Sequence, residues 1–140
     1  MAINLNQLKP NFMEWYLKVV RDNYANFSGR ARRQEYWMFV LFNLIFAFGI
    51  AFIAGLLGQM TDTPAFMGLY MIYILGIIIP SIAVAVRRLH DVGKSGWFYL
   101  IALIPLIGGI WLIVLFATEG DRGQNMYGPD PKETKTNVTV

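Results

Sequence analysis

The sequence predicts an all-α integral membrane protein: a helical bundle with three transmembrane helices, preceded by an N-terminal amphipathic helix at the membrane interface. Hydrophobic residues make up 56% of the 140-residue chain and charged residues only 15%, whereas a soluble domain is typically about 25% charged. Three apolar runs can cross a hydrocarbon layer of about 30 Å as helices. They cover residues 36–60, 65–86 and 96–117. We expect one membrane domain over residues 1–131 and a flexible tail over residues 132–140.

The connector between the second and third runs predicts the orientation. It contains Arg87, Arg88 and Lys94 against one acid, Asp91, and short loops rich in lysine and arginine stay on the cytoplasmic side. The turn at residues 62–64 carries no basic residue and suits the outer face. We therefore expect a multi-pass protein of the bacterial inner (cytoplasmic) membrane with a cytoplasmic N-terminus. The first ten residues lack the pattern of a cleavable signal peptide.

Composition argues against several classes of function. The formal charge of +3 and the pI near 9.3 would fit a nucleic-acid binder, but the basic residues cluster beside the apolar runs, where retention at the inner face explains them. The absence of cysteine excludes disulfides, thiolate metal sites and a cysteine nucleophile. A single histidine argues against a histidine-based metal site. We expect no nucleic acid, no metal and no cofactor.

Residues 12–25 have the pattern of a short amphipathic helix. Polar residues Glu14, Lys18, Arg21 and Asp22 share one side, and Phe12, Tyr16, Val19 and Val20 share the other. The segment is too short and too charged to span a membrane. It is expected either to lie along the headgroups with its aromatic residues at the apolar boundary, or to pack against the protein's own cytoplasmic loops; the pattern serves both.

A stripe of small residues marks the first spanning helix. Ala47, Ala51 and Gly55 follow one another at intervals of four, and such a stripe lets another helix approach closely.

Two prolines predict breaks in the later helices. Pro80 cannot donate a backbone hydrogen bond to the carbonyl of Gly76, and Pro105 lies mid-way along the third run. Both fall at about the same depth as Asn43, the amide within the first span. Freed carbonyls need donors, and Asn43 or Ser81 could supply them. In one interpretation, hydrogen bonds within the protein satisfy the carbonyls freed at the kinks. In the other, these residues form a polar pocket within the membrane.

The third run admits two paths. A kinked but simple crossing is favoured, because each arm of a hairpin broken at residues 105–109 would have only about ten residues and reach half of the membrane. In a re-entrant hairpin the tail would instead return to the inner face and pair its acids with the arginines.

Six basic residues are candidates for an anion-binding or lipid-binding role. They are Arg30, Arg32, Arg33, Arg87, Arg88 and Lys94. On a helix, Arg30 and Arg33 would share a face and project as a comb of guanidinium groups at the water boundary. In the plainer interpretation, these residues orient the protein in the membrane and contact anionic headgroups. The sharper one is a defined site for a lipid headgroup, a phosphate-bearing solute or an acidic partner protein.

His90 and Asp91 do not predict a catalytic dyad. Adjacent residues on a helix point about 100° apart, and neither a nucleophile nor paired carboxylates accompany them. Asp91 lies one turn after Arg87, which favours an ion pair between these two. We therefore predict no catalytic residue.

Four motifs together resemble the domain of unknown function 805 family, small bacterial inner-membrane proteins of the YhaH type. They are Phe27–Trp37, Arg87–Trp97, Pro105–Gly108 and Asn125–Pro131. The resemblance covers nearly the whole chain, in order. It implies a multi-spanning bacterial inner-membrane protein and brings neither an activity nor catalytic residues.

The function expected from the sequence is that of a non-enzymatic membrane protein. It would associate with itself or dock a membrane-protein partner, with a basic cytoplasmic face on anionic lipid or ligand. One alternative is a small oligomeric transporter or pore with its site at the level of Asn43, Pro80 and Pro105. Another is a membrane enzyme that acts on anionic lipid headgroups through His90.

Overall fold

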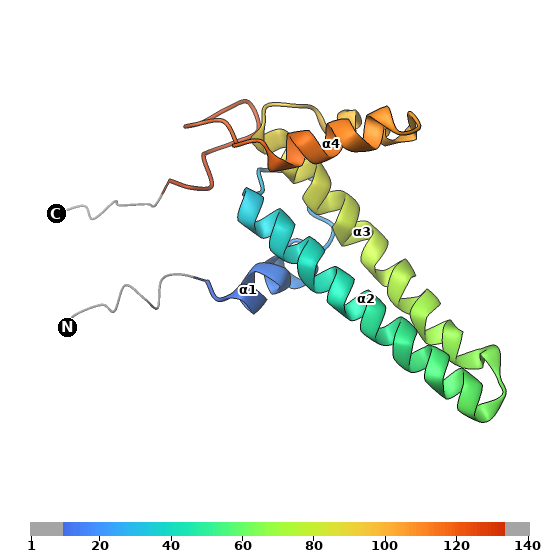
Figure 1. Ribbon diagram of the computed structural model, residues 1–140. Helices are drawn as coiled ribbons and strands as arrows, with labels where there is room; N and C mark the ends of the chain where they lie inside the picture. Colours follow the sequence, from blue (N-terminus) through green and yellow to red (C-terminus); the bar gives the residue numbers. More distant parts are fainter. Residues whose placement is uncertain (1–9, 134–140) are drawn as a thin grey trace, which may run out of the picture.

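The computed structural model describes residues 10–133, and all the regular secondary structure in that range is helical. Figure 1 shows two long helices side by side, with shorter helical segments gathered toward one of their ends. The elements in chain order are α1 (Phe12–Leu17), the π-helix η2 (Lys18–Asp22), α2 (Arg33–Thr61), the 3₁₀ turn η3 (Pro64–Phe66), α3 (Met67–Asp91), the 3₁₀-helix η4 (Gly96–Leu103) and α4 (Ile107–Ala117).

The helices α2 and α3 form a long antiparallel hairpin (Figure 1). The first helix ends because Asp62 adopts the left-handed conformation, with φ of 50°, and donates its N–H to the carbonyl of Gly58. Thr63 then caps the next turn by accepting from the N–H of Ala65, and Pro64 occupies the first helical position, where a missing N–H costs nothing. Local chemistry therefore explains the tight reversal.

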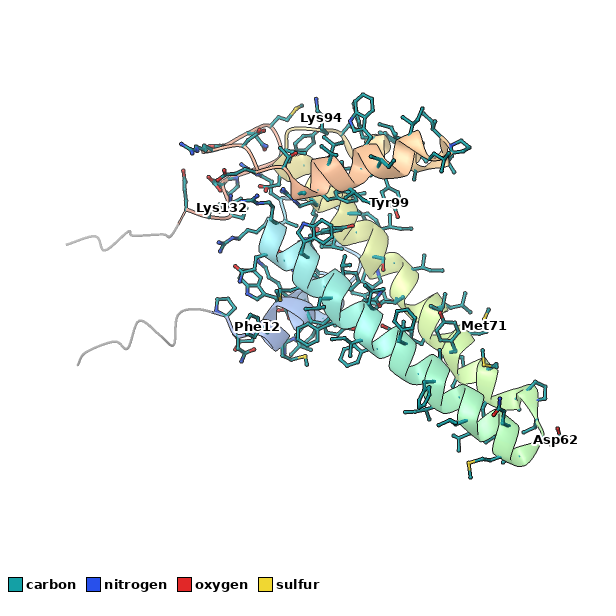
Figure 2. All side chains as sticks on the ribbon, viewed as in Figure 1. Phe12, Asp62, Met71, Lys94, Tyr99 and Lys132 are labelled. Carbon is teal, nitrogen blue, oxygen red and sulfur yellow. The ribbon has the colours of Figure 1, made fainter. Side chains whose placement is uncertain are left out.

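The outer surface of this hairpin is apolar. The helices Arg33–Thr61 and Pro64–Asp91 are long and apolar enough to cross a membrane, yet only 6% and 22% of their most apolar stretches are buried within the protein. Figure 2 shows their side chains projecting outward on both helices. A core helix of a soluble protein would be mostly covered. The prediction of an all-helical protein with long apolar helices is thus confirmed.

The N-terminal helix packs against the protein itself. A capping box starts it: the Asn11 side chain accepts from the N–H of Glu14 at 2.9 Å, and Glu14 accepts from the N–H of Asn11 at 2.8 Å. Trp15, Tyr16 and Val19 are buried, and the Tyr16 ring stacks on Phe39 of α2 with centroids 5.8 Å apart.

This packing corrects the expectation for residues 12–25. The helical segment ends at Asp22, and Trp15 and Tyr16 lie against the protein instead of at the apolar boundary of the headgroups. Its partners are α2 and α3 together with Ala31 and Arg32 of the segment before α2, so packing against the protein is the alternative that holds. Phe12 and Met13 remain exposed.

The third apolar run folds back on itself. Gly96–Leu103 and Ile107–Ala117 are separate helical arms joined at residues 104–106, where Leu106 has a φ of 65°. Figure 1 shows α4 crossing the C-terminal end of α3 at a steep angle. Beyond α4, the N–H of Asp121 donates to the carbonyl of Asp91, at 2.7 Å. The run therefore begins and ends beside the same end of α3.

The break near Pro105 is confirmed, but the simple crossing that the sequence favoured is wrong. Arm length was the argument for a crossing, and contacts distant in sequence override it. The arms touch where Gly108 passes Ile101: a Cβ at Gly108 would overlap the Ile101 carbonyl oxygen. That carbonyl accepts from the N–H of Ile104 at 2.9 Å.

The hydrogen bonds of the polar groups near Pro80 differ from those that the sequence predicts. α3 continues through Pro80, and the carbonyl freed at Gly76 accepts from the hydroxyl of Tyr24 at 2.5 Å. Asn43 accepts from the hydroxyl of Tyr73, also at 2.5 Å. Ser81 donates to Ile77 on its own helix, at 2.7 Å. Neither Asn43 nor Ser81 serves the Gly76 carbonyl, and the donor, Tyr24, comes from the N-terminal segment.

We predict that Gly108→Ala lowers the thermal unfolding midpoint in detergent. The added methyl group overlaps the backbone of Ile101, so the arms must separate, and overpacking of this kind costs about 1–3 kcal/mol. Gly109→Ala is the matched control, because a Cβ there meets no atom within 4 Å and alanine favours a helix. Equal midpoints for the two variants would show that the arms do not touch.

Candidate functional site

The charged residues of the described chain gather at one end of the α2–α3 hairpin. Within residues 10–133, every lysine, arginine and histidine lies before Tyr36, in the 87–94 connector or after Ala117. Asp62 is the one charged residue of this range at the opposite turn. We call the charged end, with its N-terminal, connector and tail segments, the charged cap.

The first centre of the charged cap is the Asp91 cluster, formed by Arg30, Arg88 and Asp91. Arg30 Nε donates to Asp91 Oδ1 at 2.9 Å, and Arg88 Nη1 donates to Asp91 Oδ2 at 2.5 Å. None of the three side chains is more than 1% exposed. One carboxylate thus holds two guanidinium groups from segments about 60 residues apart in sequence.

Backbone carbonyls accommodate the second positive charge of this cluster. Arg88 donates to the carbonyl of Phe116 at 3.0 Å and also to that of Thr118. These acceptors stand at the C-terminal end of α4, where the helix dipole is negative. Arg30 reaches the tail segment (residues 118–131), donating to the carbonyls of Gly123 at 2.6 Å and Asp121 at 2.5 Å.

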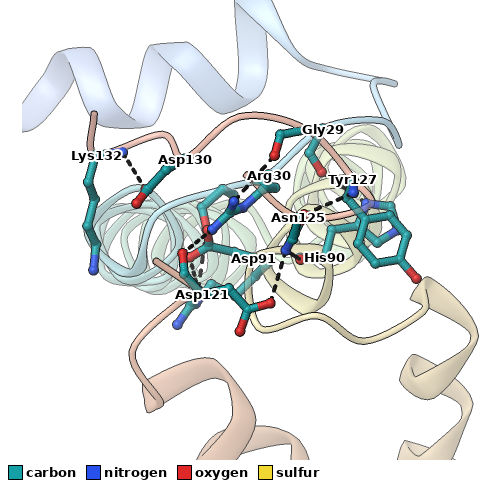
Figure 3. A network of polar contacts seen from close by, with 12 residues as sticks. Gly29, Arg30, His90, Asp91, Asp121, Asn125, Tyr127, Asp130 and Lys132 are labelled. Atoms are coloured by element: carbon teal, nitrogen blue, oxygen red, sulfur yellow. Dashed lines mark hydrogen bonds and ion pairs between the residues drawn. The ribbon is translucent and has the colours of Figure 1, made fainter. Parts of the chain in front are cut away.

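Figure 3 shows how the tail segment closes over this cluster. In the re-entrant alternative, the acids of the tail were expected to pair with the arginines; instead its backbone carbonyls accept from them. The approach is close enough to require glycine, because a Cβ at Gly120 would overlap the Asp91 carboxylate. Gly93, with a φ of 73°, likewise leaves room for the side chain of Asp121.

The second centre is the Glu35 cluster, formed by Lys18, Glu35 and Arg87. Glu35 is fully buried and accepts from Arg87 Nη1 at 2.6 Å, while Lys18 Nζ lies 3.2 Å from its other oxygen. Glu35 also stands in the first turn of α2, where the helix dipole favours a negative charge. This carboxylate ties η2, α2 and α3 together.

Glu35 was missed as a site residue from the sequence. The available signal was a lone acid at the start of a long apolar run, where a carboxylate is costly unless a cation accompanies it. Its pairing with Arg87 also explains why the expected Arg87–Asp91 ion pair is wrong. Arg87 turns to Glu35, and Asp91 pairs with Arg88 and Arg30.

His90 and Asp91 serve different contacts, as their adjacency on a helix predicts. The His90 Nδ1 atom lies 2.9 Å from the carbonyl of Gly29, and its ring stacks on Tyr127 with centroids 4.0 Å apart. Asn125 donates to the backbone carbonyl of His90 at 2.9 Å. These contacts fasten the tail segment to the end of α3, as Figure 3 shows.

The six predicted anion-binding residues differ in exposure. Arg30, Arg87 and Arg88 are buried, and α2 begins only at Arg33 with Arg32 as its N-cap, so the expected comb of exposed guanidinium groups is wrong. Arg32 is half-buried over the Trp15 ring, 5.4 Å from its centroid. Arg33 and Lys94 are exposed, although Arg33 also donates to the carbonyl of Ala117 at 3.1 Å. An anion-binding role for the exposed pair stays a prediction.

Two carboxylates of the tail segment have lowered pKa values. Backbone N–H groups of Lys132 and Gly123 donate to Asp130 and hold its pKa below the ordinary range. The hydrogen bond from Lys132 lowers the pKa of Glu119. Stabilisation from a depressed carboxylate pKa is present above the unfolded value of about 4 and is lost as the pH falls through the folded value. The stabilisation from these tail contacts is therefore present at neutral pH and is lost on acidification.

The remaining predicted positions do not assemble into a site. Asn43 and Ser81 each bond elsewhere, as described above. Ala47, Ala51 and Gly55 lie half-buried along α2. Over residues 10–133, no group of three or more acidic or histidine side chains is placed to hold a metal ion.

Two long apolar helices that the rest of the chain leaves uncovered, with the charges at one end, define a small helical membrane protein. The chain belongs to the family described as "Protein of unknown function (DUF805)", whose family model matches residues 24–129. The resemblance predicted from the four motifs is therefore confirmed.

Two curated relatives cover most of this chain. One is "Inner membrane protein YhaI" of Escherichia coli (strain K12), 48% identical over 120 residues that make up 86% of this chain and 97% of the relative. Another is "Inner membrane protein YhaH" of the same strain, 47% identical over 123 residues, with coverage of 86% and 98%. "Uncharacterized protein YiiR" is 29% identical over 138 residues. No solved structure matches the chain.

We predict that Asp91→Asn frees the tail segment and strongly destabilises the protein. It leaves Arg30 and Arg88 buried without a counter-charge, and removal of one partner from a buried ion pair costs about 3–5 kcal/mol. Limited proteolysis should cut the variant near residues 118–131 at a protease concentration that spares the parent chain. Asp62→Asn, at the opposite turn, should leave the cleavage pattern unchanged. Protection of the Asp91→Asn tail equal to that of the parent would contradict this role.

Proposed function

We propose that this chain is a non-enzymatic protein of the bacterial inner membrane, with α2 and α3 crossing the bilayer and the charged cap on the cytoplasmic side. The observation that carries the proposal is the confinement of every described lysine and arginine to one end of an uncovered apolar hairpin. Basic segments beside spanning helices are retained inside. The names of YhaI and YhaH as inner membrane proteins support the location in the inner membrane.

In this arrangement the 96–117 hairpin enters the cytoplasmic leaflet without crossing the bilayer. Its arms of eight and eleven residues are each about 16 Å long, roughly half of the hydrocarbon layer. The residues near the tip, Leu103 and Leu106, are 78% and 85% exposed. Both ends of the described chain then lie on the cytoplasmic side.

This topology predicts opposite labelling of two introduced cysteines, and the chain has none of its own. Ala65→Cys, at the far turn, should react in intact cells with a thiol reagent that cannot cross the inner membrane. Arg122→Cys, in the tail segment, should react only after that membrane is opened. The parent chain is the unlabelled control. Labelling of Arg122→Cys in intact cells would contradict the proposed topology.

The proposed activity is self-association or partner docking through α2, with the exposed residues Arg33 and Lys94 facing anionic headgroups. Ala47, Ala51 and Gly55 provide a small-residue face on α2, and close helix contacts in membranes favour such faces. A Cβ at Gly55 would meet no atom within 4 Å, so the protein itself leaves room there for a second helix. His90 and Asp91 are engaged in contacts that hold the tail, which favours a structural role over catalysis.

We predict that Gly55→Leu converts an oligomer in mild detergent to a smaller particle, because leucine fills the space that the partner helix needs. Particle mass from light scattering measures the change. Gly49→Leu is the matched control: a Cβ there also meets nothing within 4 Å, and the position lies on a different face of α2. A monomeric parent chain, or an unchanged mass for Gly55→Leu, would remove self-association from the proposal.

A further inference from the structure

A cleft of about 480 Å³ opens where the third apolar run leaves α3. Its volume lies in the range of small-molecule sites, about 300–1,000 Å³. It is lined from the N-terminal segment, α3 and η4 by Phe27, Ile82, Val86, His90, Trp97 and Leu100, among others. The cleft lies where η4 packs beside α3.

The cleft runs from the charged cap into the apolar part of the protein. Along α3 it extends from His90 back to Ile82, about 12 Å at 1.5 Å per residue. The His90 end lies within the charged cap, and the Ile82 end is surrounded by apolar side chains. Trp97, at its rim, is 80% exposed. An apolar cleft that starts at the headgroup level suits a molecule with a polar end and a hydrocarbon chain.

The polar end of the cleft is formed by His90 and Ser95, and no acidic residue lines it. The exposed Lys94 does not line the cleft itself but immediately precedes the lining residue Ser95. The Lys94 ammonium lies 5.6 Å from the Phe98 ring centroid. His90 directs Nδ1 to the carbonyl of Gly29, which can only accept, so the proton of a neutral ring sits on Nδ1 and Nε2 is left as an acceptor.

We infer that this cleft binds one anionic phospholipid of the cytoplasmic leaflet, with an acyl chain between Ile82 and Leu100 and the headgroup phosphate at Lys94. The inference rests on the proposed function in one respect: the charged cap must face the cytoplasmic leaflet. The apolar lining selects a hydrocarbon chain, and the cation adjacent in sequence to Ser95 favours a negative headgroup. His90 Nε2 accepts a hydrogen bond from a headgroup hydroxyl, as phosphatidylglycerol offers.

Native mass spectrometry of the full chain in detergent tests this inference. Phosphatidylglycerol and phosphatidylcholine with identical acyl chains are titrated separately. The expected result is one saturable lipid per chain, with phosphatidylglycerol bound more tightly. Leu100→Trp fills the cleft and should weaken this binding by about tenfold, through lost contact with the chain. Leu75→Trp, on an exposed part of α3 outside the cleft, should bind like the parent.

A second pair of variants separates headgroup from chain. Lys94→Gln should remove the preference for phosphatidylglycerol while the cleft still accepts a chain, and its exposed position spares the fold. Arg122→Gln, another exposed cation of the charged cap, should keep the preference.

Two results would overturn the cleft as a lipid site. The first is an unchanged lipid adduct in Leu100→Trp, which would leave general headgroup contact by the charged cap standing. The second is equal binding of both lipids by the parent chain, or binding of neither. The cysteine labelling described above reads the topology independently, so a failure of the proposed function is recognised separately from a failure of the cleft.

Discussion

The burial of two carboxylates among cations at one end of the α2–α3 hairpin is the constraint on which the rest of the structure depends. Glu35 joins η2, α2 and α3, and Asp91 joins the N-terminal segment to α3. A buried carboxylate or guanidinium group is costly unless a counter-charge accompanies it. Segments from across the sequence must therefore meet at this end, whatever their own helix preferences.

The same constraint explains the path of the third apolar run. Arg88 and Arg30 share a single acid, so their remaining N–H groups need other acceptors. The C-terminal carbonyls of α4 and those of the tail segment provide them. These carbonyls reach Arg88 only if the run returns to the end of α3 from which it started. The hairpin and the return of the tail segment to the end of α3 then follow from one electrostatic requirement.

What could be predicted from the sequence was local. The apolar helices expected at residues 36–60 and 65–86, the break at Pro105 and the family all rest on composition or motif. In the structure the two helices extend over Arg33–Thr61 and Met67–Asp91. The contacts that decide the site are not local. Arg87 pairs with Glu35, 52 residues away, instead of with Asp91 one turn along. The Gly76 carbonyl accepts a hydrogen bond from Tyr24. Helical periodicity does not predict which residues distant in sequence will pair.

A double-mutant cycle on Glu35 and Arg87 tests the central claim most directly. Glu35→Gln, Arg87→Met and the double variant are unfolded in the same detergent, and the free energies of unfolding are compared. If the buried pair organises the charged cap, each single variant leaves one buried charge unpaired and is strongly destabilised. The double variant should then lose clearly less than the sum of the two single losses. Additive losses would contradict the account.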